Sequence, residues 1–237
     1  MQSLLTISPL TKSRQSNRVK VLMTVVGFFI LTSFALPQTV LADELDVEKL
    51  QSQIYSAVNK VIPAVVAIND RGSIFSGVIV SKEGHILTAG HALRPNTNYK
   101  VILSDGRTFQ SRGLGSNRRI DMAMLKISGD NLPFAEMGNS FKIIKNQPCI
   151  GVSHPGIFNQ NRGAVVRFGY VIEPVTSNEG MIKSTAKMEP GDSGGPLIDL
   201  NGKVIGIHSN IRRDEEANYD VPVDSFRKHW DLSLIHI

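Results

Sequence analysis

Two sets of short β-rich segments constrain the fold of this chain more than any other feature of its sequence. Each set holds six segments with alternating or continuous apolar residues, a pattern typical of strands. The first set lies at residues 64–68, 76–81, 85–89, 99–103, 107–113 and 122–127, and the second at 148–153, 164–172, 181–186, 196–199, 203–209 and 217–221. The segment 128–146 joins the two sets and carries no strong strand pattern.

Turn sequences within each set indicate antiparallel hairpins. Lys-Glu-Gly at 82–84, Ser-Asp-Gly at 104–106 and Asn-Gly at 201–202 each separate two of the segments. Such turns connect neighbouring antiparallel strands. We therefore predict an all-β fold of two packed six-stranded antiparallel β-barrels, at about 63–127 and 147–222.

A helix is expected at each end of the barrels. Residues 43–62 carry a helical stripe that Pro63 ends, and residues 223–230 suit a closing helix. The stripe consists of Val47, Leu50, Ile54, Ala57, Val58 and Val61.

The first 42 residues have the three parts of a secretory signal. Basic residues precede an apolar run at 21–36, and Val-Leu-Ala at 40–42 suits signal peptidase, so cleavage is predicted after Ala42. An uncleaved anchor is the alternative, although roughly 17 apolar residues are marginal for crossing a ~30 Å hydrocarbon core. Either way, the rest of the chain is expected outside the cytoplasm, in the periplasm, secreted, or anchored to the membrane.

The formal net charge of +5 does not indicate a polyanionic partner. Four of the 26 basic residues precede residue 43 and no acidic residue does, which leaves 22 basic against 21 acidic residues in the mature chain, a net of +1. We therefore expect no nucleic-acid partner, and membrane contact only if the N-terminal segment stays uncleaved. At the other end, residues 232–237 (Leu-Ser-Leu-Ile-His-Ile) match a translated sequencing adapter, so we exclude them from the predicted domain at 63–231.

The strongest chemical signal is Gly-Asp-Ser-Gly-Gly-Pro at 191–196. Glycines let the backbone turn tightly, expose a serine hydroxyl and aim successive N–H groups at one point. His91 ends one predicted strand and Asp121 begins another. Each alone would more often be structural, but the order His–Asp–Ser in strand contexts predicts the catalytic residues His91, Asp121 and Ser193.

In this triad the Ser193 hydroxyl would need a base within hydrogen-bond reach to activate it, and the imidazole of His91 can be that base. Asp121 would hold the imidazole in the useful tautomer. Backbone N–H groups of Gly191 and Ser193, together with that of Asp192, would form the oxyanion hole.

The chain resembles the chymotrypsin-like serine proteases, and more closely their HtrA/Deg-type bacterial branch. The resemblance covers roughly residues 60–230, and its motifs are at 63–68, 76–81, 87–91, 103–107, 121–126 and 191–197. The chain departs from the usual sequence pattern of this branch at two places. Asp192 stands where Asn is usual, and Arg-Phe-Gly-Tyr at 167–170 replaces Thr-x-Gly-Ile, which is expected to alter the loop that feeds the oxyanion hole.

The resemblance implies an exported serine endopeptidase that acts on polypeptides, with Ser209 as a hydrogen-bond donor behind Asp121. Some HtrA-type relatives act as chaperones, so a quality-control or peptide-binding module with little proteolysis is the alternative. Such relatives usually carry C-terminal PDZ domains, and no PDZ sequence occurs in the 237 residues. The oligomeric state is not indicated.

The resemblance also implies a substrate pocket at Met188, His208, Ser209 and Asn210. His208 stands where similar glutamyl endopeptidases carry a pocket histidine, which would suit an acidic P1 side chain. The branch prefers small aliphatic P1 residues, and a histidine packed in the barrel is the third interpretation.

Other features favour less specific interpretations. Residues 191–195 also fit the G-x-S-x-G elbow of α/β-hydrolases, but that fold needs its acid and histidine after the serine. Cys149, the one cysteine, lies in a strand-like segment and is expected to be a packed thiol. His85, His154 and His229 lack ligand spacing, so we predict no metal and no cofactor.

Overall fold

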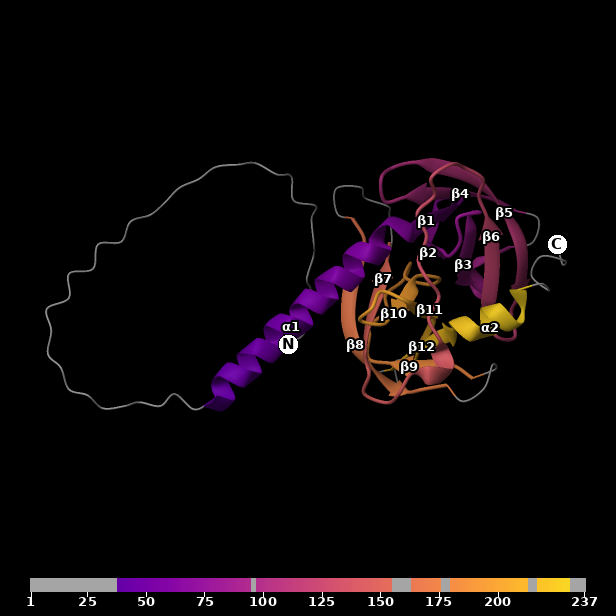
Figure 1. Cartoon of the computed structure of the whole chain (residues 1–237). Coiled ribbons are helices and arrows are strands. Elements are labelled where there is room, and N and C mark those ends of the chain that lie inside the picture. Colours follow the sequence, from indigo (N-terminus) through magenta and orange to yellow (C-terminus); the bar gives the residue numbers. More distant parts are fainter. Residues whose placement is uncertain (1–37, 95–96, 155–162, 176–179, 213–216, 231–237) are drawn as a thin grey trace, which may run out of the picture.

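Two closed antiparallel barrels make up the body of this computed structural model, which describes residues 38–94, 97–154, 163–175, 180–212 and 217–230. The barrels lie side by side, with a long helix at the N-terminal end and a short one at the C-terminal end (Figure 1). The predicted fold class is therefore confirmed. Of the predicted signal segment 1–42, residues 1–37 lie outside the described residues, as do the adapter-like residues 232–237.

The first barrel closes in the order β1-β2-β3-β6-β5-β4. Its strands are β1 Val65–Asp70, β2 Ser73–Ile79, β3 His85–Ala89, β4 Asn98–Leu103, β5 Thr108–Asn117 and β6 Met122–Lys126. Gly84 and Gly106, in the predicted turns, have φ values of 88°. A residue with a side chain is strained in this left-handed region, so both turns depend on glycine.

The second barrel closes in the order β10-β11-β12-β9-β8-β7, which repeats the ring order of the first. Its strands are β7 Pro148–Ser153, β8 Val165–Glu173, β9 Ile182–Ser184, β10 Pro196–Ile198, β11 Val204–Arg212 and β12 Ala217–Pro222. The sequence shows no internal repeat, so the two barrels share a topology without a shared sequence pattern.

The main difference from the predicted strands is β5, which continues beyond residue 113 to Asn117. A bulge between Gly113 and Gly115 shifts its register, and the strand then pairs with β6 as far as Asn117 opposite Met122. Bulges accommodate one extra residue while the ladder continues. The extension directs the chain toward Asp121, just before β6.

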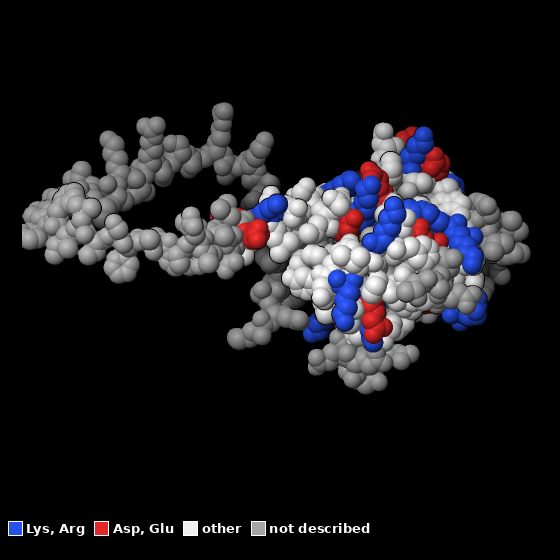
Figure 2. All heavy atoms as spheres, turned by 60° about the horizontal axis from the view of Figure 1, so that its bottom comes forward, with Lys and Arg blue, Asp and Glu red and all other residues white. Residues whose placement is uncertain are grey.

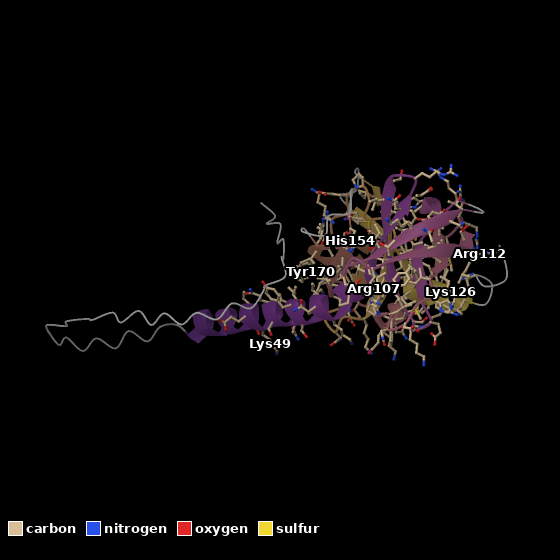
Figure 3. All side chains as sticks on the ribbon, turned by 90° about the horizontal axis from the view of Figure 1, so that it is seen from above. Lys49, Arg107, Arg112, Lys126, His154 and Tyr170 are labelled. Carbon is tan, nitrogen blue, oxygen red and sulfur yellow. The ribbon has the colours of Figure 1, made fainter. Side chains whose placement is uncertain are left out.

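Helix α1 (Gln38–Val61) packs against the barrels only through its last turns, contrary to the full apolar stripe expected from the sequence. Ala57, Val58 and Val61 are buried, whereas Val47 is 64% exposed. Lys49 lies on the part that extends away from the barrels (Figure 3). The helix also begins earlier than the predicted residue 43.

Among the described residues, no helix combines the length and the apolar character needed to cross a membrane.

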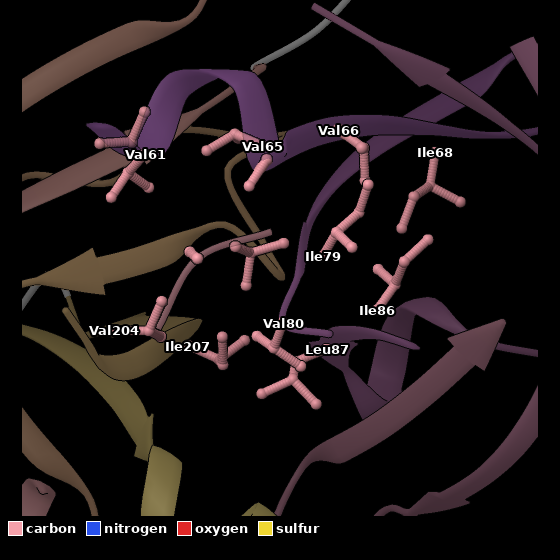
Figure 4. Close-up of a cluster of buried hydrophobic side chains, with 14 of the residues drawn as sticks. Val61, Val65, Val66, Ile68, Ile79, Val80, Ile86, Leu87, Val204 and Ile207 are labelled. Carbon is pink, nitrogen blue, oxygen red and sulfur yellow. The ribbon is translucent and has the colours of Figure 1, made fainter. Parts of the chain in front are cut away.

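One hydrophobic core runs from the end of α1 through both barrels (Figure 4). Val61 of α1, Leu87 of the first barrel and Val204 and Ile207 of the second are all fully buried. Burying one such side chain contributes about 1.5–3 kcal/mol relative to leaving it in water. The shared core keeps the two barrels in one orientation, which matters for a site formed between them.

The segment between the barrels is held by the short C-terminal helix α2 (Val223–Lys228). Asp224 accepts hydrogen bonds from the backbone N–H and the hydroxyl of Ser140, at 2.6 and 2.8 Å, in the 3₁₀ turn η3 (Ser140–Lys142). Arg227 donates to the carbonyls of Met137 and Gly138. The later part of the segment is therefore fixed to the C-terminal helix, while Ala135 earlier in it donates its N–H to the Ile79 carbonyl of the first barrel at 2.9 Å.

The surface charges agree with the near-neutral balance of the mature sequence. Lys and Arg side chains are interspersed with Asp and Glu on the face in view (Figure 2). For example, Glu136 lies within 3.5 Å of both Lys60 and Lys203.

Candidate active site

The two barrels bring His91, Asp121 and Ser193 together. His91 lies in the 3₁₀ turn η2 (Gly90–Ala92) that follows β3, and Asp121 directly precedes β6. Ala89 of β3 pairs with Met122 of β6, and the Gly90 N–H donates to the Asp121 carbonyl at 3.0 Å. Ser193 comes from the second barrel, in the loop between β9 and β10.

The three side chains form a continuous hydrogen-bonded series. His91 Nε2 lies 3.1 Å from Ser193 Oγ, and His91 Nδ1 lies 2.9 Å from Asp121 Oδ2. The Asp121 carboxylate also accepts the backbone N–H of His91 at 2.7 Å. These distances are the ones that a serine nucleophile, its base and a group that orients the base would require.

Ser209 supports Asp121 from the second barrel. Its hydroxyl donates to Asp121 Oδ2, and the Asn210 amide donates to Ser209 Oγ at 3.1 Å. The carboxylate therefore has fixed donors on both sides. This is the place that the resemblance implied for Ser209.

The environment shifts the pKa values of the His91–Asp121 pair in opposite directions. The hydrogen bond to Asp121 raises the pKa of His91 above its ordinary 6.5, and this outweighs burial and the nearby Arg118 cation. Burial raises the pKa of Asp121, but hydrogen bonds from His91 and Ser209 outweigh that effect and lower it below 3.8. Asp121 is thus a carboxylate at neutral pH, as a partner of an imidazolium must be.

The loop before Ser193 leaves two backbone N–H groups available. Within the described parts of the chain, the N–H groups of Gly191 and Ser193 have no hydrogen-bond acceptor. The N–H of Asp192, by contrast, donates to the Glu189 carbonyl at 3.0 Å. This hydrogen bond engages the only amide proton of Asp192, which argues against the expectation that Asp192 is a third oxyanion donor.

Ser76 of β2 was not singled out from the sequence, yet it holds the loop of Ser193 from the other barrel. Its N–H donates to the Ser193 carbonyl and its hydroxyl to the Gly191 carbonyl, both at 2.9 Å. A Cβ on Gly194, where φ is 88°, would lie 2.1 Å from the Ser76 carbonyl oxygen. The required glycine at 194 was the one sequence signal of this close approach.

Arg167 reaches the same loop. It lies in strand β8, as do the other residues of the Arg-Phe-Gly-Tyr departure. Its guanidinium lies 2.6 Å from the Asp192 carboxylate and 3.1 Å from that of Glu189.

The structure divides the four predicted pocket residues into two groups. Ser209 and Asn210 line a cavity of about 520 Å³ beside His91 and Asp121. Met188 and His208 are buried instead, with 5% and 1% exposed.

His208 is bound within the second barrel. Its Nδ1 lies 2.5 Å from the carboxylate of Asp220, which is fully buried and also accepts the Ser184 hydroxyl at 3.1 Å. A Cβ on Gly151 would lie 2.6 Å from His208 Nε2, so the ring also packs closely against β7. These contacts agree with the interpretation of a histidine packed in the barrel. The sequence carried no sign that Asp220 would be its partner.

The other candidate chemistries have ordinary structural explanations. Cys149 is a buried thiol whose pKa is raised by burial and by the nearby Asp220 carboxylate. His85 bonds to Ser81 at 2.8 Å. Across the described ranges, no three His, Cys, Asp or Glu side chains gather so that they could hold a metal ion. The closed antiparallel barrels exclude the α/β-hydrolase alternative, which requires a parallel sheet.

Curated relatives carry the same type of domain. A periplasmic serine endoprotease of Marinomonas sp., described as DegP-like, is 35% identical over 143 residues, which cover 60% of this chain and 30% of the relative. A DegP-like endoprotease of Pseudomonas putida is 34% identical over 141 residues, covering 59% and 29%. The chain thus spans about 30% of the length of these relatives.

Solved structures give the same assignment. The HtrA-type protease AlgW with a tripeptide has a TM-score of 0.68 and 28% identity, covering 76% of this chain and 63% of that one. The serine endoprotease of Yersinia pestis has a TM-score of 0.66 and 26% identity, covering 76% and 66%. The family model of the trypsin-like peptidase domain matches residues 75–207, more than half of the sequence. The chain therefore belongs to the trypsin-like peptidase family, and it is similar to HtrA/Deg-type proteases.

Proposed function

We propose that this protein is an exported serine endopeptidase that hydrolyses polypeptides through an acyl-enzyme on Ser193. The observation that carries the proposal is the series Ser193–His91–Asp121, with separations of 3.1 and 2.9 Å. The family assignment supports it, and the tripeptide named with AlgW supports a peptide as the substrate.

In the first half of the reaction, Ser193 Oγ attacks the peptide carbonyl carbon while its proton passes to His91 Nε2. Asp121 stabilises the imidazolium, and the N–H groups of Gly191 and Ser193 bind the oxyanion. When the C–N bond breaks, His91 returns the proton to the leaving amine.

The second half repeats these steps with water as the nucleophile. His91 accepts a proton from the water as it attacks the acyl carbon, and the bond to Ser193 Oγ then breaks. The proton on His91 returns to Ser193 Oγ, so the enzyme regains its starting state and the peptide acid is released.

The direct test is casein digestion by the purified full chain, together with labelling by a fluorophosphonate. We expect cleavage of casein and a single covalent adduct, which peptide mapping by mass spectrometry locates at Ser193. A chain that protects an aggregating client but neither cuts casein nor reacts would support the quality-control alternative and overturn the proposal.

The pair His208–Asp220 leads to a prediction about the P1 residue. If a P1 side chain enters between Met188 and His208, a P1 carboxylate would meet an imidazole whose Nδ1 already bonds to the Asp220 carboxylate at 2.5 Å. An inadequately paired buried charge costs 2–5 kcal/mol or more, so we expect Val-P1 peptides to be cut at least about tenfold faster than Glu-P1 peptides.

This preference is measured as kcat/KM on two peptides that differ only at P1, with the parent and with His208→Ala. Faster cleavage after Glu, lost in His208→Ala, would show an acidic pocket instead. Equal rates in both proteins would contradict both interpretations.

Export is proposed from the N-terminal signal and is supported by the periplasmic naming of the DegP-like relatives. We expect the exported protein to begin at Asp43, as N-terminal sequencing would report. A chain that keeps residues 1–42 and sediments with the membrane would instead be anchored.

A further inference from the structure

The residue before the nucleophile carries a fully buried carboxylate. Asp192 has no exposed surface, and both of its carboxylate oxygens have donors. Oδ1 accepts the Ser153 hydroxyl at 2.5 Å, and Oδ2 accepts Arg167 Nη1 and the Glu189 N–H, both at 2.6 Å. A buried charge requires such partners, because burial removes its hydration.

Arg167 supplies the compensating positive charge from strand β8. It is 8% exposed, and its register partner is Gly151 of β7, so its backbone belongs to the wall of the second barrel. While Nη1 contacts Asp192, Nη2 donates to Glu189 Oε2 at 3.1 Å. The guanidinium thus joins the barrel wall to two acidic residues of the Ser193 loop.

The position of Asp192 determines where the loop aims its free amides. Its N–H donates to the Glu189 carbonyl at 3.0 Å and its carbonyl accepts the Gly195 N–H at 2.8 Å. Gly191 and Ser193 are its two neighbours in the chain, and Gly191 has a φ of 99°. A displacement of the Asp192 side chain would therefore rotate the two N–H groups that would bind the oxyanion.

We propose that Arg167 is a positioning residue that holds the oxyanion hole in its competent geometry through Asp192. The inference rests on the proposed peptidase function and adds a residue outside the triad to it. Arg167 itself touches no reacting atom; it acts by fixing Asp192, and with it the amides of Gly191 and Ser193.

The proposal also explains why the chain departs from the branch pattern at both places. Asp192 replaces an Asn, and Arg167 stands at the Thr of Thr-x-Gly-Ile. The two side chains that differ are in contact, so the negative charge of one departure is balanced by the positive charge of the other. Asp192 without Arg167 would be a buried carboxylate with no counter-charge, which is strongly unfavourable, whereas Arg167 without Asp192 would keep only the carboxylate of Glu189 as a partner.

The test is a double-mutant cycle in the full chain with Arg167→Thr, Asp192→Asn and the double variant. We expect each single variant to lose about 10²–10³ in kcat, the effect of one misplaced oxyanion donor. KM should change by less than about threefold, because the donors act mainly in the transition state. The double variant restores a neutral pair and should recover kcat to within about tenfold of the parent, since contacting residues are not additive.

Two further variants and one measurement of folding make the cycle decisive. Arg107→Thr, which removes an exposed ion pair with Asp105 at 2.8 Å, is the matched control and should leave kcat unchanged. Arg167→Lys keeps the positive charge and should retain more of the parental kcat than Arg167→Thr does. Circular dichroism gives the folded fraction of each variant, so that kcat is expressed per folded molecule.

Two outcomes would overturn the proposal. Folded single variants with parental kcat would mean that the ion pair only stabilises the fold. A double variant no better than the worse single one would mean that the two residues do not act as a pair. If the parent itself cleaves no peptide, the proposed peptidase function fails, and the proposed role of Arg167 fails with it. If the parent cleaves peptides and the single variants keep its kcat, only the role of Arg167 fails.

Discussion

Replacing Ser193 by alanine is expected to lower peptide hydrolysis by about 10⁶ in kcat, the loss seen when the nucleophile of such a triad is removed. Ser193 Oγ lies 3.1 Å from His91 Nε2, and the substitution leaves the base with no hydroxyl to activate. The measurement is the kcat of the parent and the variant on one peptide that the parent cleaves.

Ser52→Ala is the matched control, because Ser52 is exposed on α1, away from the barrels, and the same hydroxyl group is removed. It should retain the activity of the parent. Residual hydrolysis by Ser193→Ala above about 1% of the parent would contradict the assignment of the nucleophile, since triads without their serine retain far less. Client protection that survives in the variant would point to a separate chaperone activity.

Asp121→Asn should lower kcat by about 10⁴, because an amide favours the wrong imidazole tautomer while keeping the geometry. The carboxylate lies 2.9 Å from His91 Nδ1 and also accepts the Ser209 hydroxyl, so both contacts change together. Asp105→Asn, in an exposed hairpin turn, is the matched control and should leave kcat unchanged.

The same variant should shift the pH profile. His91 acts as a base only when neutral, and the hydrogen bond to Asp121 raises its pKa above 6.5. The acid limb of kcat/KM for the parent should therefore lie above pH 6.5, with activity lost as the pH falls through it. Without the carboxylate this limb should move to lower pH, and an unmoved limb would contradict the assignment of His91 as the titrating base.

The strand pattern was readable from the sequence because it is local. Alternation within each segment and turn residues such as Asn201 and Gly202 depend on near neighbours. The prediction missed the end of a strand where pairing with a distant strand decides that end. Strand β5, for example, extends to Asn117 because it pairs with β6. The exposure of Val47 on α1 could not be predicted for the same reason, since only tertiary contacts decide which part of an apolar stripe is covered.

The candidate triad could likewise be predicted from residue types and order, whereas its surroundings could not. Gly194 alone hinted at a close neighbour, and no residue indicated that Ser76 would bind the backbone of the Ser193 loop or that the Asp192 N–H would donate to Glu189. Hydrogen bonds between distant segments depend on how the two barrels pack, and the type of a single residue does not reveal that packing.

The sequence by itself determined the two sets of strands, the turns between them and the residue types of the proposed triad. Only the tertiary structure decided that His208 binds Asp220 and that Arg167 binds Asp192. The physical reason is the range of the interactions. Strand and turn preferences act over a few residues, but the partner of a buried charge is chosen by barrel closure and register, which bring distant strands into contact.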